Sequence, residues 1–141
     1  MQNTPRSTHC ILELYGCPSD LLNDLYFVRD AVQQASQQGL STLLDMSSHQ
    51  FHPQGVTVVG LLAESHISIH TWPECGYAAV DVFTCGESAE PQRACQYLVE
   101  RFRARQHQRF TVPRGYGQLP TPSVLMQSAS EEEVDLCPVQ S

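Results

Sequence analysis

Hydrophobic and polar residues alternate along two neighbouring stretches in the middle of the chain, which is the period of a half-buried β-strand. In residues 66–72 isoleucine alternates with histidine and serine, and in residues 77–85 alanine and valine alternate with tyrosine, aspartate, phenylalanine and cysteine. The intervening residues 73–76 contain the proline and glycine typical of a turn. The pattern therefore predicts an antiparallel hairpin with one apolar face.

The opposite face of this hairpin collects chemically reactive side chains. In the predicted register His70 lies near Ala79, and Ser68 lies near Asp81. Cys85 falls on the same side by parity, because side chains alternate between the two faces of a strand. A polar face that combines histidine, serine, aspartate and cysteine indicates a functional site.

The flanking residues predict a sheet with two helices. Apolar positions from Leu21 to Ala35 recur every three or four residues, so they predict one amphipathic helix that starts at Pro18-Ser19-Asp20 and stops at Gly39. A second helix opens at Glu90-Pro91, with proline in its tolerated first turn. The remaining strands are predicted at residues 9–15, 40–52, 56–63 and 107–112.

This order of elements predicts an α+β fold, a two-layer α/β sandwich with two helices on one face of a mostly antiparallel sheet. We expect residues 1–117 to form a single domain. Residues 118–141 are rich in proline, serine and glutamine and include an acidic run, so we expect a disordered acidic tail. The open sheet face carries aromatic side chains, which favours a homodimer that covers it.

Composition narrows the possible partners. The net charge of -7 argues against binding nucleic acid. No apolar run approaches the roughly 18 residues of a membrane span, and the first residues lack the apolar core of a signal peptide. We therefore expect a cytoplasmic protein with no membrane partner. Its six irregularly spaced cysteines are expected to stay reduced, without a disulfide framework.

All eight basic residues are arginines, and lysine is absent. A lysine Schiff base, either with a substrate or with pyridoxal phosphate, is therefore excluded on this chain. If the site carries out amine chemistry, its carbonyl group must have another source.

Each candidate residue also has an ordinary interpretation. A single serine such as Ser65 is commonly a surface residue, His66 and His70 are compatible with ordinary strand histidines, and Cys85 is compatible with a small buried apolar residue. A zinc site is improbable, because no CxxC pair or helical HxxxH spacing accompanies these ligand types, which also include Cys75. The sequence therefore predicts no metal.

The two central stretches resemble a known family. Glu-Ser-His-Ile-Ser-Ile-His-Thr-Trp-Pro-Glu at 64–74, followed by Gly-Tyr-Ala-Ala-Val-Asp-Val-Phe-Thr-Cys-Gly at 76–86, is similar to the prokaryotic small-subunit S-adenosylmethionine decarboxylases. The similarity runs from about residue 9 to residue 114. Members of this family are pyruvoyl-dependent enzymes of spermidine and polyamine biosynthesis, which make their own carbonyl from the backbone. That property agrees with the absence of lysine.

The resemblance implies autocatalytic cleavage of a proenzyme between Glu64 and Ser65, into fragments 1–64 and 65–141. Ser65 becomes the covalent pyruvoyl group, which forms a Schiff base with the substrate. His70 matches the base that removes the Ser65 α-proton during processing. Thr57 occupies a position where the family usually has a serine that supports processing.

The same resemblance implies how substrate is used. Cys85 matches the proton donor of turnover, Phe51 the ring that stacks on adenine, and Glu74 the carboxylate that holds the ribose. The implied assembly is a homodimer of cleaved two-chain protomers. Two alternatives stay open: the same fold acting on ornithine or arginine, and a non-catalytic homologue that regulates an active partner.

Overall fold

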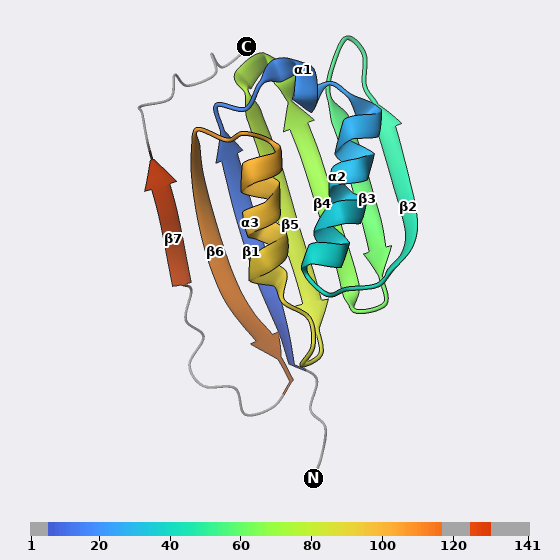
Figure 1. Ribbon diagram of the computed structural model, residues 1–141, viewed down its shortest axis with the longest axis vertical. Coiled ribbons are helices and arrows are strands. Elements are labelled where there is room, and N and C mark those ends of the chain that lie inside the picture. Colours follow the sequence, from blue (N-terminus) through green and yellow to red (C-terminus); the bar gives the residue numbers. More distant parts are fainter. Residues whose placement is uncertain (1–5, 117–124, 131–141) are drawn as a thin grey trace.

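The computed structural model describes residues 6–116 and 125–130 of the chain. Seven strands form one sheet in the order β2-β3-β4-β5-β1-β6-β7, and each neighbouring pair is antiparallel. The two longer helices, α2 and α3, lie on the same face of this sheet (Figure 1). The predicted α+β sandwich is confirmed. The strands are β1 (Arg6–Tyr15), β2 (Leu43–Gln50), β3 (Val56–Leu62), β4 (Ser65–Trp72), β5 (Tyr77–Cys85), β6 (Gln106–Gly115) and β7 (Leu125–Ser130); the helices are α1 (Ser19–Leu22), α2 (Leu25–Gln38) and α3 (Pro91–Arg101).

The central hairpin of β4 and β5 has the predicted register, with Ser68 opposite Asp81 and His70 opposite Ala79. One turn of 3₁₀ helix, η1 (Pro73–Cys75), joins the two strands. Gly76 closes that turn in the left-handed conformation with φ of 63°, which glycine adopts without steric penalty.

The apolar core lies between the sheet and the helices. The β5 side chains alternate between buried and half-buried along the whole strand, and β3 alternates in the same way. Helix α2 packs on β2 and β3, whereas α3 packs on β1 and β5. The opposite sheet face carries no helix in the described part of the chain (Figure 1). We call it the open face. The largest fully buried side chains are Phe102, Leu12, Leu14, Leu22, Ile67, Ile69, Leu98, Val28, Val32, Val56, Val58 and Val82.

The first predicted helix is in fact two helices, so the prediction of one continuous helix is wrong. Helix α1 ends at Leu22, and Asp24 begins α2 by accepting a hydrogen bond from the Phe27 N–H at 3.1 Å. An aspartate that caps a helix in this way interrupts the preceding one, because its side chain replaces a backbone acceptor. The apolar spacing continues across the break and concealed it in the sequence.

The predicted disordered tail lies largely outside the described residues. Within residues 118–141 the structure describes only β7, which pairs with β6 from Gln106↔Ser130 to Thr111↔Leu125. These six residues differ from the expectation. Composition predicted a tail too polar to fold alone, whereas pairing with an existing strand edge needs no core of its own.

The cysteines differ from the prediction at one position. Cys10, Cys17, Cys85 and Cys95 are free thiols, as expected. Cys75, half-exposed in η1, takes part in a disulfide bond, so the expectation that every cysteine stays reduced is wrong there. Spacing and compartment were the only guides available in the sequence, whereas pairing depends on which sulfurs the fold brings together. No helix among the described residues is long and apolar enough to cross a membrane.

Candidate active site

The Glu64–Ser65 peptide bond lies at the start of β4, immediately after the tight connection from β3. Ser65 has a backbone φ of 154°, which L-amino acids rarely adopt. Such a conformation costs on the order of 1–3 kcal/mol and persists only where the surrounding structure imposes it. A strained residue therefore lies directly after the bond that the sequence predicts to be cut.

Two donors from Cys85 converge on the Glu64 carbonyl oxygen. The Cys85 backbone N–H donates to this oxygen at 3.0 Å, and the Cys85 thiol donates to it at 3.0 Å. The Glu64 carboxylate is occupied separately, accepting from the Thr42 N–H at 2.9 Å. Two donors aimed at one carbonyl polarise it and stabilise negative charge that develops on its oxygen.

His70 has a hydroxyl partner on the neighbouring strand. The Thr57 Oγ1 and His70 Nδ1 atoms are 3.0 Å apart, and the two residues face each other across β3 and β4. This hydrogen bond orients the imidazole ring of His70, leaving its other nitrogen free to exchange a proton. The threonine keeps the hydroxyl of the serine expected at this position.

Phe51 and Glu74 lie at the same end of the sheet as His70. Phe51 follows β2 directly, where its ring makes an edge contact with His49 at 4.6 Å, and the ring is 47% exposed. Glu74 is exposed in η1, which follows the end of β4. The four residues Phe51, Thr57, His70 and Glu74 form what we call the histidine end.

Aromatic side chains extend the histidine end along the open face. Trp72 stacks on Tyr77 with ring centroids 5.2 Å apart, and Tyr77 stacks on Tyr15 at 5.6 Å. The Tyr77 hydroxyl donates to Glu13 at 2.7 Å. Burial and the nearby Glu13 carboxylate raise the pKa of Tyr77, so its hydroxyl stays protonated at neutral pH. This end of the face is therefore aromatic, with the Glu13 carboxylate beside its rings.

The histidine end is remote from the cleavage end, by which we mean Glu64, Ser65 and Cys85. Ser65 and His70 are five residues apart on the extended strand β4, a Cα separation of roughly 16 Å at about 3.3 Å per residue. Figure 1 shows the start of β4 and the end of β5 at the opposite end of the sheet from the connection between these two strands, where η1 lies. The fold thus brings the predicted site residues into two groups, and a single chain does not unite them.

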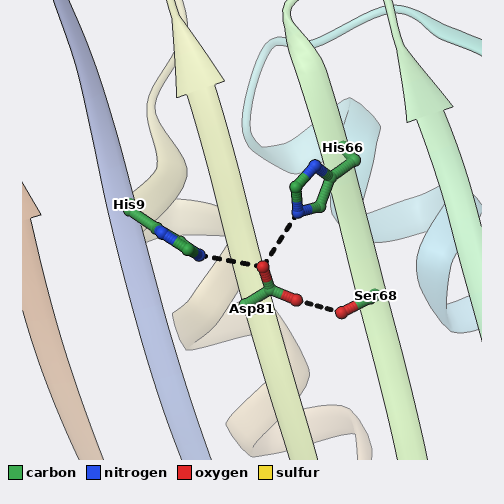
Figure 2. A network of polar contacts seen from close by, with 4 residues as sticks. All are labelled: His9, His66, Ser68 and Asp81. Carbon is green, nitrogen blue, oxygen red and sulfur yellow. Dashed lines mark hydrogen bonds and ion pairs between the residues drawn. The ribbon is translucent and has the colours of Figure 1, made fainter. Parts of the chain in front are cut away.

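Sequence reasoning missed one cluster on the open face, midway between these two ends. The Asp81 Oδ2 atom lies 2.8 Å from His9 Nε2 and 2.9 Å from His66 Nε2, while Asp81 Oδ1 accepts from the Ser68 hydroxyl (Figure 2). Burial opposes ionisation of Asp81, but these three hydrogen bonds outweigh it, so the pKa of Asp81 is lowered. His9 is 72 residues from Asp81, and only the pairing of β1 with β5 signals their contact.

Comparison with known proteins identifies the family. Residues 8–115 match the sequence model of the family described as S-adenosylmethionine decarboxylase. The chain belongs to this family. A relative from Synechococcus sp. (strain WH7803), named S-adenosylmethionine decarboxylase proenzyme, is 56% identical over 99 residues, which cover 70% of this chain and 77% of the relative.

More distant members of the S-adenosylmethionine decarboxylase family agree. A proenzyme of the same name from Moorella thermoacetica is 44% identical over 112 residues, which cover 79% of this chain and 90% of the relative. The crystal structure of the adenosylmethionine decarboxylase from Aquifex aeolicus matches with a TM-score of 0.76 and 34% identity, over 84% of this chain and 98% of that one. The family resemblance drawn from the two central stretches is confirmed.

Proposed function

We propose that this chain is the proenzyme of a pyruvoyl-dependent S-adenosylmethionine decarboxylase that cleaves itself between Glu64 and Ser65. The observation that carries the proposal is the double hydrogen bond from Cys85 to the Glu64 carbonyl oxygen, next to the strained Ser65. Pairing of β4 with β5 accounts for the N–H donor, but it does not account for the thiol that joins it on a carbonyl whose following residue carries a hydroxyl. The arrangement is what attack on that carbonyl requires.

Processing then runs through residues of the chain itself. The Ser65 hydroxyl adds to the Glu64 carbonyl carbon, and the negative charge on oxygen is held by Cys85. The C–N bond breaks, which leaves an ester between Glu64 and the Ser65 side chain and a free Ser65 amine. A base removes the Ser65 α-proton, and the Cβ–O bond breaks to release the Glu64 carboxylate. Hydrolysis of the resulting dehydroalanine, with loss of ammonia, leaves a pyruvoyl group at the new N-terminus.

The residues present fit this group. Ser65 supplies its three carbons, and the absence of lysine leaves no competing amine on a side chain. When formed, the pyruvoyl carbonyl supplies the electron sink that decarboxylation of an α-amino acid needs. The proton-donor role of Cys85 is supported by its thiol, which lies within hydrogen-bond reach of the Glu64 carbonyl at the same end of the site.

We further propose that the active form is a homodimer with shared sites. His70 serves as the base for Ser65, yet the two lie roughly 16 Å apart along one strand. A two-fold axis near the middle of β4 would place the cleavage end of one copy against the histidine end of the other. The open face supports such packing, because Val59, Leu61 and Trp72 are 39%, 53% and 43% exposed on it.

S-adenosylmethionine is the substrate that the histidine end favours. Phe51 offers an exposed flat ring for adenine, and Glu74 offers two oxygens for the ribose hydroxyls. Ornithine or arginine has no ring to stack. Measuring labelled CO2 released from all three compounds by wild type and by Phe51→Ala distinguishes these substrates. Only S-adenosylmethionine should be decarboxylated. The variant should bind it more weakly, by about 0.5–1.5 kcal/mol for the lost ring stacking in addition to the contribution of the lost buried area. Release from a basic amino acid alone would overturn the substrate assignment.

The decisive experiment on cleavage is intact-mass analysis of the purified protein. We expect two fragments, 1–64 and 65–141, the second blocked by a keto group that reacts with a carbonyl reagent. Ser65→Ala is the matched control and should remain one chain. A wild-type chain that stays at full length and carries no keto group would contradict the pyruvoyl proposal.

A further inference from the structure

Two imidazole rings and one carboxylate converge at a single point on the open face. The Nε2 atoms of His9 and His66 lie 2.8 and 2.9 Å from the Asp81 Oδ2 atom, and all three atoms lie within 4.8 Å of one another (Figure 2). Their side chains are 21%, 38% and 25% exposed in that order in a single chain, so the fold holds them on the part of the open face that the proposed dimer covers. None of the three has a role in the proposed cleavage.

The three side chains stand on a rigid base. They come from β1, β4 and β5, which are adjacent strands in the middle of the sheet. His9 and His66 both lie directly opposite Phe83 in the strand register, and their rings contact the Phe83 ring at 5.1 and 5.7 Å between centroids. This shared contact restricts both imidazoles to orientations that point their Nε2 atoms at Asp81.

The carboxylate is oriented from behind. Ser68 donates to Asp81 Oδ1, which leaves Oδ2 as the atom directed at both histidines (Figure 2). Hydrogen bonds of this kind to the non-ligating oxygen are the usual support of a metal-bound carboxylate.

We propose that His9, His66 and Asp81 bind a divalent transition-metal ion of the zinc type. Two imidazole nitrogens and one carboxylate oxygen form a common ligand set for such ions, with metal–ligand distances of about 2.0–2.2 Å. Binding needs small side-chain rotations and a proton on Nδ1 of each ring, so that both Nε2 lone pairs face the ion. Water or a group of the second copy completes the coordination.

The sequence predicts no metal, and the ligand types in its central stretches, namely His66, His70, Cys75 and Cys85, differ from this set. Only His66 belongs to both, because the strand spacing places His70, Cys75 and Cys85 elsewhere on the sheet. The metal proposal and the cleavage proposal can be contradicted independently. Ser65→Ala should abolish cleavage, and it alters none of the proposed metal ligands. The metal alone is therefore a sufficient probe.

The test is titration of the chelator-treated purified protein, which is expected to consist of fragments 1–64 and 65–141, with Co²⁺, followed by absorption spectroscopy, and with Zn²⁺, followed by calorimetry. We expect saturable, stoichiometric binding, with visible cobalt bands and without the near-ultraviolet band of a thiolate ligand. His9→Ala and Asp81→Asn should each weaken binding by at least tenfold, and Ser68→Ala should weaken it by about 10- to 100-fold. His52→Ala removes an exposed imidazole outside the cluster and should leave binding unchanged.

His9→Gln separates metal binding from structural support. Its amide still donates a hydrogen bond to Asp81, so the network is retained, but it removes the imidazole ligand. A folded His9→Gln protein that loses binding supports the metal site. Absence of saturable binding to wild type, binding of equal strength in His9→Gln, or a dominant thiolate band would overturn it and leave the cluster as a hydrogen-bonded network.

Discussion

Cys85 combines two roles at the residue scale. Its N–H and thiol both hold the Glu64 carbonyl oxygen, and the thiol is also the proton donor expected in turnover. In the proposed function one side chain therefore serves the precursor and then the enzyme. Only the thiol is removed by substitution, because the backbone donor belongs to every residue at this position.

Cys85→Ala should slow cleavage by at most about 10²- to 10³-fold, the usual cost of losing one of two donors to a developing oxyanion. Decarboxylation by the fragments that do form should fall further, because no other group at the cleavage end replaces the proton donor. Time-resolved gel analysis measures the first rate, and labelled CO2 release measures the second. A variant with normal turnover and normal product would contradict the proton-donor role.

Asp81 should make stability depend on pH. Its pKa is lowered from the ordinary value of 3.8, so the folded state favours the carboxylate more than the unfolded chain does. The stabilisation is fully present above pH 4 and is lost as the pH falls through the lower folded pKa. Asp81→Asn should therefore be less stable than wild type at pH 7, and the difference should shrink below pH about 4. Urea midpoints from pH 7 to pH 3 measure it; a constant difference would contradict the linkage.

Helix α2 and strand β3 show how closely the two layers approach at the element scale. A Cβ added at Gly60 would lie 2.7 Å from Val32 Cγ1 and 3.1 Å from Leu43 Cδ1. The glycine is needed for this close contact, which fixes α2 over the strand that carries Thr57.

Gly60→Ala should destabilise the fold by about 1–3 kcal/mol through overpacking. Gln37→Ala, exposed on the same helix, should change stability by less than about 0.5 kcal/mol. Val32→Ala removes the atom that the new methyl group would meet. Gly60→Ala should therefore cost less stability when it is added to the Val32→Ala protein than when it is added to wild type. Denaturant unfolding measures the stability of wild type and of each variant. If the effects of Val32→Ala and Gly60→Ala simply add in the double variant, the proposed clash is contradicted.

At the scale of the whole molecule, the separation between the two ends of the site is the basis of the proposed homodimer. If Ser65 of one copy meets His70 of the other, each dimer has two shared sites. A chain with Ser65→Ala and a chain with His70→Ala each lack one half of the machinery. Paired in a hybrid dimer, they form one site with both defects and one intact site.

Co-expression of the Ser65→Ala and His70→Ala chains should therefore restore cleavage of the His70→Ala chain. With equal amounts and random pairing, about half of those chains should be cut, because about half lie in hybrids. Distinguishable affinity tags and mass analysis identify the cut chain. Absence of cleavage in isolated hybrids would show that His70 does not act across the dimer.

Local pattern determined much of this protein. The period-two alternation of β4 and β5 predicted the hairpin, its register and its polar face, and the two central stretches identified the family. These features depend on neighbours in the sequence, because strand alternation and turn chemistry act over a few residues. The same locality misled the prediction at Asp24, where the apolar spacing of two helices runs on as if there were one.

Long-range pairing decided the rest. Placing β1 between β5 and β6 brings His9 to Asp81, and the extended form of β4 keeps Ser65 away from His70. Only the first result is hidden from the spacing of residues, because burial of the whole sheet selects which strands become neighbours, whereas the second follows from the length of one predicted strand. The sequence by itself determined which chemical groups the protein has, and the tertiary structure decided which of them one chain can bring together.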